Sequence, residues 1–145
     1  MIKFEHSEVI NRPVQDVFEY ITNIDNWPNW SGEVIEIKKI SERPIDLGTT
    51  FSTSVRVMGR QIENTIEVVA YDQDRKLSLK TTSGPVDGFL HCNFEPVEGS
   101  TKLTVSGQGE LGGFYKLVEP IVNDLLQNQY KTAFATLKDL LDAQT

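Results

Sequence analysis

The sequence predicts an α+β fold in which a curved antiparallel sheet of about seven strands wraps around a long C-terminal α-helix. Two observations support this prediction. Polar and apolar residues alternate along most of the chain, and turn residues separate the alternating stretches, as in successive β-hairpins. Near the C-terminus the apolar residues instead recur three and four positions apart, which is the spacing of an amphipathic helix.

The N-terminal part of the chain is expected to form one strand and two short helices. Residues 2–10 alternate, which predicts a half-buried strand. Pro13 fixes a helical backbone angle in the first turn of a helix that continues to Ile21. A second short helix runs toward Trp30, and Pro28 is expected to interrupt it.

Six more strands are expected in the middle of the chain. The alternating stretches cover residues 35–38, 51–57, 61–68, 77–79, 90–94 and 103–105. The turn residues between them are Met58-Gly59-Arg60, Asp72-Gln73-Asp74, Gly84-Pro85 with Asp87-Gly88, and Glu98-Gly99-Ser100. Because short turns join antiparallel neighbours, we expect a meander with one buried face and one wet face.

The last element is predicted to be a single amphipathic helix over residues 117–141, with Pro120 tolerated only near its start. This helix is the largest apolar surface available to cover the buried face of the sheet. A single helix contacts a strongly curved sheet along only part of its length. We therefore expect one domain over residues 1–145, with a cavity between the sheet and the helix.

Composition and charge exclude several classes of protein. The chain of 145 residues has a net charge of −7, which argues against a nucleic-acid partner because phosphate binding needs a basic face. No apolar stretch is long enough to cross a membrane, and the N-terminus does not resemble a signal peptide. The single Cys92 cannot form an intrachain disulfide, which agrees with a cytoplasmic location.

Several short motifs resemble those of a known superfamily. They are Val9-Ile10-Asn11-Arg12-Pro13 with Val17-Phe18, Ile24-Asp25 with Trp27-Pro28-Asn29-Trp30, Gly48-Thr49, Val69-Ala70-Tyr71-Asp72 with Arg75-Lys76-Leu77, and Phe94-Glu95-Pro96-Val97-Glu98-Gly99-Ser100-Thr101. Together they resemble the START-like, or helix-grip (SRPBCC), superfamily, and within it the branch of polyketide cyclase/dehydrase and lipid-transport proteins. The resemblance covers the whole chain and is more specific for the fold than for an activity.

The resemblance implies a helix-grip fold whose cavity takes hydrophobic or amphipathic small molecules. It implies no catalytic residue, because the superfamily shares no single catalytic set. The function we expect is the binding or carrying of a lipid- or polyketide-like molecule without a cofactor. The side chains expected on the cavity wall are Phe51, Val55, Ile66, Leu79, Phe94, Val105, Val122 and Leu125.

Polar and aromatic residues give further candidates for ligand contact. Trp27 and Trp30 either line the mouth of the cavity or fasten their helix to the sheet. Asn64 and Thr81 lie in predicted strands, where each orients a polar end of the ligand or sits at a wet strand end.

His6 and Glu8 share a face of the first predicted strand with Phe4 and Ile10. If that face points into the cavity, they form an acid/base pair, and a carboxylate in such a place serves as a general base. The alternative, which we favour, is that Glu8 lies at the rim of the sheet and His6 is a hydrogen-bonded structural residue.

Two other patterns are better explained by structure than by chemistry. Gly107-Gln108-Gly109-Glu110-Leu111-Gly112 fits the dinucleotide-binding pattern, but no second parallel strand follows it. We interpret these glycines as residues that let the last strand bend and approach the helix. Cys92 alternates with Leu90 and Phe94, which favours a buried thiol over a nucleophile, and no residues have the spacing of a zinc site.

Two other functions remain open from the sequence. An aromatase/cyclase-type enzyme would hold a polyketide-like chain and use His6 or Glu8 for proton transfer. A protein-interaction module, such as a co-chaperone or accessory subunit, would have a filled interior and an exposed apolar patch. A dry, open, apolar cavity would favour the carrier.

Overall fold

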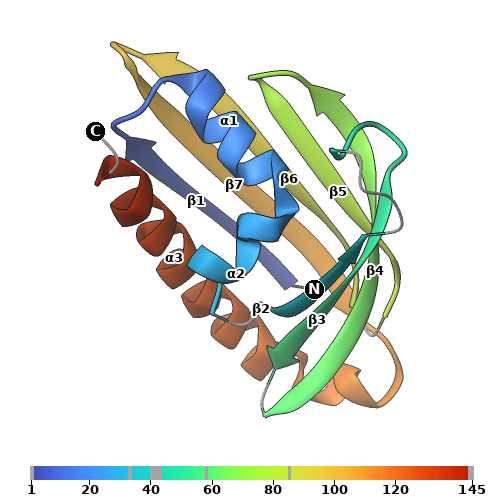
Figure 1. Ribbon diagram of the computed structural model, residues 1–145. Coiled ribbons are helices and arrows are strands. Elements are labelled where there is room, and N and C mark those ends of the chain that lie inside the picture. Colours follow the sequence, from blue (N-terminus) through green and yellow to red (C-terminus); the bar gives the residue numbers. More distant parts are fainter. Residues whose placement is uncertain (1, 33, 40–43, 58, 85, 144–145) are drawn as a thin grey trace.

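The computed structural model describes residues 2–32, 34–39, 44–57, 59–84 and 86–143 (Figure 1). The elements in chain order are β1 (Ile2–Ile10), α1 (Val14–Thr22), the 3-10 helix η1 (Ile24–Asn26), α2 (Trp27–Trp30), β2 (Val34–Lys39), β3 (Thr50–Val57), β4 (Arg60–Asp72), β5 (Lys76–Ser83), β6 (Val86–Val97), β7 (Ser100–Leu111), the 3-10 helix η2 (Gly113–Val118) and α3 (Glu119–Asp142).

The strands form one antiparallel sheet in the order β1-β7-β6-β5-β4-β3-β2. Consecutive strands from β2 to β7 are neighbours, and β1 pairs with β7, so β1 and β2 are the two edges. A two-residue turn joins β6 to β7, and both of its residues, Glu98 (φ 49°) and Gly99 (φ 83°), have the positive φ angles of a type I′ hairpin. The predicted antiparallel meander and the long C-terminal helix are therefore confirmed.

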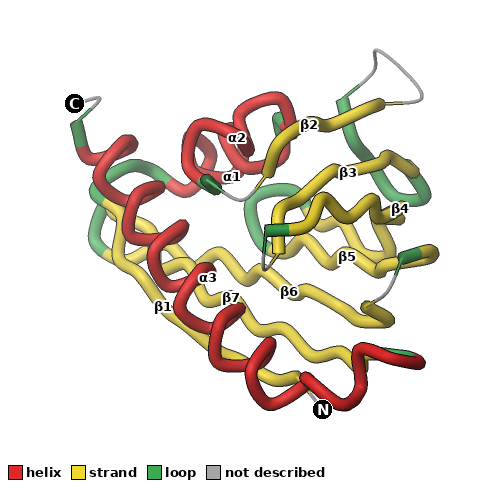
Figure 2. The backbone as a smooth tube through the Cα atoms, turned by 90° about the horizontal axis from the view of Figure 1, so that it is seen from below, coloured by secondary structure: helices red, strands yellow, loops and turns green. Residues whose placement is uncertain are grey.

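The helices cover the concave side of the sheet unevenly. Helix α3 packs along β1, α1 packs on β6 and β7, and α2 lies between α3 and β2 (Figures 1 and 2). Figure 2 shows the sheet curving from β1 round to β2, with α2 at the open side. The concave faces of β3, β4 and β5 therefore lie at a distance from the long helix, and this separation positions the site described below.

Helix α3 also provides hydrogen-bond partners for backbone groups at the outer edge of β1. An edge strand exposes backbone groups that have no strand partner. Here side chains from both ends of the helix bond to the β1 backbone and to the residue that follows it. The pairs are Lys3 N–H to Asn123 Oδ1 (3.1 Å), Gln127 Nε2 to Lys3 O (3.2 Å), Lys138 Nζ to Val9 O (2.8 Å) and Asn11 N–H to Asp142 Oδ1 (2.8 Å).

The hydrophobic core lies mainly between α1, the second half of α3 and the sheet. Its largest fully buried side chains include Ile10, Phe51, Leu77 and Leu137. Each such side chain contributes about 1.5–3 kcal/mol of transfer free energy. A second, smaller cluster of Ile2, Leu111 and Val122 lies where α3 begins.

Two predictions about breaks in the chain are wrong. Pro28 does not interrupt a helix but lies in the first turn of α2. The backbone N–H that proline lacks would have had no acceptor within the helix at this position, so no hydrogen bond is lost. Asp87 and Gly88 belong to β6 rather than to a turn, and a side chain on Gly88 would overlap the backbone of β7. Met58 and Pro85, which were expected in turns, lie outside the described residues.

The glycine-rich pattern also differs from the prediction. Strand β7 does not end after Val105 but continues through the glycines to Leu111, which pairs with Val86. Gly107 does allow a close approach, but the group that lies against it is the ring of Phe4 on β1 and not the C-terminal helix. A β-carbon built on Gly107 would overlap that ring.

Candidate functional site

Small residues on the concave face leave a space inside the molecule. The inward positions of β7 carry Leu103 and Val105 and then change to Gly107 and Gly109. At Gly107 the ring of Phe4 occupies the place of a side chain, whereas Gly109 lines an open space. The core packing that surrounds Leu103 therefore does not continue to the end of the strand.

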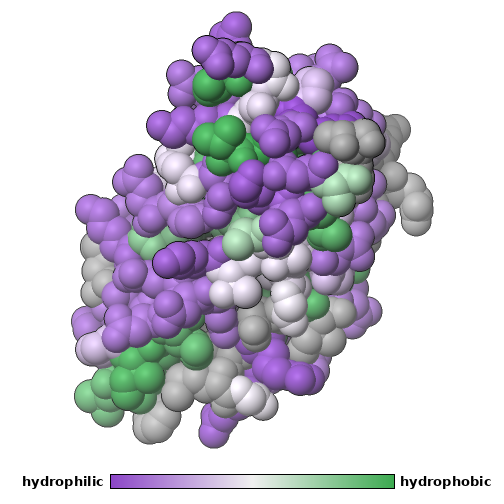
Figure 3. All heavy atoms as spheres, turned by 90° about the vertical axis from the view of Figure 1, so that its left-hand side faces the viewer, coloured by the Kyte–Doolittle hydropathy of each residue, from purple (hydrophilic) through white to green (hydrophobic). Residues whose placement is uncertain are grey.

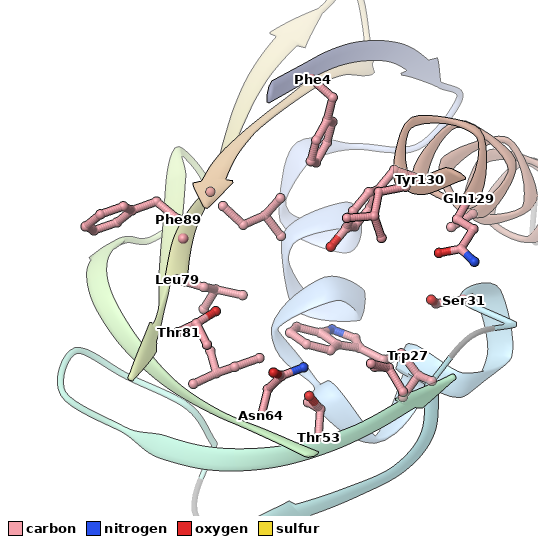
Figure 4. Close-up of a pocket in the computed structure, with 18 of the residues that line it drawn as sticks. Phe4, Trp27, Ser31, Thr53, Asn64, Leu79, Thr81, Phe89, Gln129 and Tyr130 are labelled. Atoms are coloured by element: carbon pink, nitrogen blue, oxygen red, sulfur yellow. The ribbon is translucent and has the colours of Figure 1, made fainter. Parts of the chain in front are cut away.

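A cavity of about 230 Å³ occupies this region, between the sheet, α2 and α3 (Figure 4). The residues that line it are Ile2, Phe4, Ile21, Trp27, Trp30, Ser31, Val34, Thr53, Val55, Ile62, Asn64, Ile66, Leu77, Leu79, Thr81, Gly88, Phe89, Leu90, Cys92, Gln108, Gly109, Leu126, Gln129, Tyr130, Ala133 and Phe134. Most are apolar or aromatic, as in typical small-molecule sites.

An aromatic group forms the wall on the helix side. Phe4 stacks on Tyr130 with ring centroids 4.4 Å apart and an interplanar angle of 13°. Phe134 lies one helical turn further along α3, with its ring centroid 6.4 Å from that of Tyr130 and 5.3 Å from that of Trp30. These four rings come from β1, α2 and α3, so only the folded chain brings them together.

Polar side chains lie on the opposite, sheet-side wall. Thr53 on β3 is directly paired with Asn64 on β4, and Thr81 follows on β5. Figure 4 shows Thr53, Asn64 and Thr81 grouped at the sheet, across the cavity from Tyr130. Asn64 Oδ1 is buried without a hydrogen-bond partner among the described residues, and it packs so closely on Gly84 that a β-carbon there would overlap it.

Trp27 and Trp30 use their indole groups differently. Trp27 Nε1 donates a hydrogen bond to the carbonyl oxygen of Ile21 at 2.8 Å, which fastens α2 to α1. Trp30 Nε1 is buried and has no partner within the described part of the chain. Both residues line the cavity, and the Trp27 ring also packs on Phe51 of β3 with ring centroids 5.5 Å apart, so Trp27 is in contact with the sheet as well.

The cavity is uncharged near neutral pH. Within the described residues, no Asp, Glu, Lys, Arg or His side chain lines it. Two weakly acidic groups do. Burial raises the pKa of the Cys92 thiol to about 12. Burial, together with the nearby Cys92, also raises the pKa of the Tyr130 hydroxyl, so both groups keep their protons.

Six of the residues proposed from the sequence line this cavity: Trp27, Trp30, Val55, Asn64, Ile66 and Leu79. Thr81, the other polar candidate, lines it as well. They come from α2, β3, β4 and β5, and the curvature of the sheet brings them round one space. Their contact with a ligand remains a proposal.

The other five predicted wall residues do not line the cavity. Phe51 is covered by Trp27, with ring centroids 5.5 Å apart, and Phe94 by Phe18 at 5.0 Å. Val105 is fully packed in the core. The remaining two are on α3: Val122 belongs to the smaller core cluster, and Leu125 is partly exposed on another face of the helix.

Sequence reasoning missed the helix-side wall. Phe4, Tyr130, Ala133 and Phe134 all line the cavity but were not proposed as ligand contacts. Their inward orientation was visible in the alternation of β1 and in the helical spacing of α3. The sequence carried no signal that separates these inward residues from those that pack in the solid core.

His6 and Glu8 form a hydrogen-bonded pair outside the cavity lining. His6 Nε2 donates to Glu8 Oε1 at 2.8 Å, and about a fifth of each side chain is exposed (23% and 19%). The His6 ring lies beside Phe134, with centroids 6.4 Å apart. The pair is therefore on the inward face, as its strand pattern allowed, but neither residue lines the cavity.

Cys92 and its neighbour His91 lie on opposite faces of β6, as the alternation indicated. Cys92 is buried, and its raised pKa removes the thiolate that a nucleophile requires. His91 lies on the other face, where its Nδ1 hydrogen-bonds Ser78 Oγ at 2.8 Å. Among the described residues, no group of three or more His, Cys, Asp or Glu side chains is arranged to hold a metal ion.

A family model described as polyketide cyclase / dehydrase and lipid transport matches residues 1–142. The chain belongs to this family. No match is found among curated protein sequences. None of the described helices is long and apolar enough to cross a membrane.

Solved structures with the fold of this polyketide cyclase/dehydrase and lipid-transport family member are distant in sequence, so they show the fold alone. A protein from Thermus thermophilus is 16% identical with a TM-score of 0.84, covering 99% of both chains. A START superfamily protein from Mycobacterium smegmatis is 13% identical with a TM-score of 0.83 over 99% of both. The di-domain ARO/CYC StfQ from the steffimycin biosynthetic pathway is 14% identical with a TM-score of 0.74, covering 97% of this chain and 45% of that one.

Proposed function

We propose that this protein binds and carries a hydrophobic small molecule, lipid- or polyketide-like, in the cavity between its sheet and α3. The observation that supports this most strongly is the cavity itself, which is walled by apolar and aromatic side chains and has no charged group among its described lining residues. A folded protein normally fills such a space, because unfilled apolar volume costs stability. Ligand binding is one reason to keep it open.

The energetics of an apolar cavity are sufficient for useful affinity. Burial of apolar surface gains about 25 cal/mol per Å², so a ligand that buries about 300 Å² gains about 7.5 kcal/mol. That free energy corresponds to a dissociation constant in the micromolar range. No charge partner is needed for such binding. A carrier without a catalytic group is therefore consistent with the lining.

The enzyme alternative has less support. It depended on His6 and Glu8, and these residues lie outside the cavity lining. StfQ, described as an ARO/CYC, has the same fold, but at 14% identity this similarity does not extend to its activity. The His6 ring lies beside Phe134, which lines the cavity, but neither His6 nor Glu8 is among the lining residues.

The interaction-module alternative depended on a filled interior together with an exposed apolar patch. The interior contains a cavity, which argues against this reading. Leu117 (84% exposed), in η2, and Ile121 (61% exposed), in the first turn of α3, are exposed hydrophobic residues. Figure 3 shows a mostly hydrophilic face with hydrophobic residues gathered at its lower end, the end where α3 begins in Figure 1. These features lie outside the cavity and leave the carrier as the better-supported function.

A pair of filling variants tests the proposal. Ile66 lines the cavity and Leu125 does not, so Ile66→Trp should block the ligand and Leu125→Trp serves as a matched control. The uncharged fluorophore 1-aminonaphthalene is titrated into each folded protein. We expect Ile66→Trp to weaken binding at least about tenfold and Leu125→Trp to leave it unchanged.

A second filling variant, Ala133→Leu, adds volume from the helix side and guards against a folding defect in Ile66→Trp. Circular dichroism and thermal unfolding confirm that each variant is folded. Native mass spectrometry of the protein as purified then identifies any small molecule that accompanies it. Absence of probe binding to the wild-type protein, or equal binding to all four proteins, would refute the carrier function.

A further inference from the structure

Resting on the proposed function, we infer that the ligand is an uncharged ring compound with a hydrogen-bonding oxygen, and that this oxygen is held by the Tyr130 hydroxyl. Ionised fatty acids are thereby excluded as the preferred class. Three features support the inference: the absence of charge in the lining, the position of the Tyr130 hydroxyl, and the size and aromatic character of the wall.

The first feature concerns charge. Apart from the indole N–H groups of Trp27 and Trp30 and the Cys92 thiol, the polar side chains among the described lining residues are Ser31, Thr53, Asn64, Thr81, Gln108, Gln129 and Tyr130, all of them neutral. An ionised carboxylate that enters such a space loses its hydration and finds no cation there, which is strongly unfavourable. A neutral oxygen loses much less hydration and needs only one hydrogen-bond donor to replace it.

The second feature is the Tyr130 hydroxyl. Figure 4 shows the Tyr130 side chain reaching from α3 into the cavity, with its oxygen at the inner end. The ring is held by its stack on Phe4 at 4.4 Å, and Tyr130 is half-buried where it lines the cavity. The polar end of a tyrosine in such a place usually finds a hydrogen-bond partner. The fixed ring therefore directs a donor at the ligand space, where an oxygen of the ligand can accept from it.

The surroundings of Tyr130 keep this donor protonated. Burial and the nearby Cys92 thiol both disfavour the phenolate. A neutral phenol donates its proton to a carbonyl, hydroxyl or amide oxygen, whereas a phenolate would only accept. Across the cavity, Thr53, Asn64 and Thr81 provide neutral polar groups for a second oxygen or an amide of the same molecule.

The third feature is the size and shape of the space. An engineered protein cavity of about 150 Å³ holds benzene, so 230 Å³ suits one or two fused rings better than a long acyl chain. The rings of Phe4, Trp30, Tyr130 and Phe134 line one wall, and the stack of Phe4 on Tyr130 leaves one face of each of these two rings free of the other. Flat surfaces of this kind favour planar ligands, which gain stacking in addition to burial.

Three competitors of similar shape separate charge from hydrogen bonding. Naphthalene-1-carboxamide is neutral and has an acceptor oxygen, naphthalene-1-carboxylate is anionic, and 1-isopropylnaphthalene is apolar. Each competitor is titrated against the complex of the wild-type protein with 1-aminonaphthalene at pH 7, and its affinity is obtained from the displacement of this fluorophore. We expect the carboxamide to bind at least about 100-fold more tightly than the carboxylate, because only the carboxylate carries an unpaired charge into the cavity.

The variant Tyr130→Phe tests the donor. It removes one oxygen atom and keeps the stack on Phe4, so the fold should persist. We expect its affinity for the carboxamide to fall about fivefold to tenfold, with no change for 1-isopropylnaphthalene. If Tyr130 had only a structural role, the substitution would instead lower the affinity for both ligands equally. Tyr71→Phe, which removes a phenolic oxygen from a partly buried tyrosine outside the cavity lining, is the matched control and should change neither affinity.

The outcomes distinguish this inference from the proposed function. Carboxylate binding as tight as carboxamide binding, with the fluorophore still bound, overturns the uncharged class and leaves the carrier standing. Equal losses for both neutral ligands in Tyr130→Phe, or no loss at all, overturn the role of its hydroxyl. If neither the fluorophore nor any competitor binds the wild-type protein, the carrier function fails and this inference fails with it.

Discussion

Trp27 and Trp30 pack edge to face with ring centroids 6.4 Å apart, yet only the indole N–H of Trp27 has a hydrogen-bond acceptor within the described chain, the carbonyl of Ile21. Loss of a buried hydrogen bond leaves its partner unsatisfied, which costs about 1–3 kcal/mol, whereas removal of an unpaired buried N–H carries no such cost. Trp27→Phe should therefore destabilise the protein more than Trp30→Phe, by at least about 1 kcal/mol.

Urea unfolding of the two single variants measures this difference directly. Both substitutions shorten a tryptophan to phenylalanine, so their losses of apolar contact are comparable and the hydrogen bond remains as the main contrast. Equal free energies of unfolding for the two variants would contradict the assignment of Trp27 as the residue that fastens α2.

Gly107 and Phe4 give a prediction about the shape of the cavity wall. A methyl group at Gly107 would overlap the Phe4 ring, which cannot swing away freely because it stacks on Tyr130. We expect Gly107→Ala to cost about 1–3 kcal/mol through overpacking and to weaken binding of 1-aminonaphthalene. Gly112→Ala is the control, because no atom lies within 4 Å of a β-carbon there. Similar stability for both variants in thermal unfolding would show that Phe4 is not confined.

The buried thiol of Cys92 predicts a dependence of stability on alkaline pH. Burial raises its pKa from 9.0 to about 12 in the folded protein. As the pH rises above 9, the unfolded chain releases this proton while the folded protein retains it. The unfolded state then binds fewer protons, so the free energy of unfolding decreases with rising pH until the folded thiol also ionises.

The variant Cys92→Ala removes this contribution. It should be less stable than the wild-type protein at pH 7 because it leaves a small cavity, but its stability should fall less steeply between pH 9 and about pH 10.5. The raised pKa of Tyr130 leaves part of the slope in both proteins. Urea midpoints at several pH values provide the measurement, and parallel curves for the two proteins would be evidence against the buried thiol.

His6 and Glu8 should be dispensable for ligand binding. Their hydrogen bond is partly exposed and lies outside the cavity lining, so His6→Asn and Glu8→Gln should each change stability by no more than about 1 kcal/mol. The affinity for 1-aminonaphthalene should remain within about twofold of the wild-type value. A tenfold loss of affinity in both variants would place the pair at the ligand and favour the enzyme.

The face on which each residue lies was predictable from the sequence. Side chains alternate along a strand with period two, so the inward positions of β1 and β3 follow from apolar spacing alone. The same reasoning, applied with the helical period, gave the long C-terminal helix. Local periodicity and turn chemistry therefore determined the element order and the antiparallel connections.

Whether an inward residue packs in the solid core or lines the cavity was not predictable from the sequence. Phe51 and Val55 share a face of β3, but Trp27 covers Phe51 while Val55 lines the cavity. On α3, Leu125 and Leu126 are adjacent and equally apolar, and only Leu126 reaches the cavity. Which inward residues touch solid core and which touch open space depends on where other segments pack.

The sequence by itself determined the fold class, the order of the elements and their antiparallel connections. Tertiary structure alone decided where the cavity lies. The curvature of the sheet, the glycines of β6 and β7, and the docking of α3 on β1 rather than over β4 leave one region unfilled. Such a space results from contacts between segments that are distant in the chain, and local spacing carries no information about those distances.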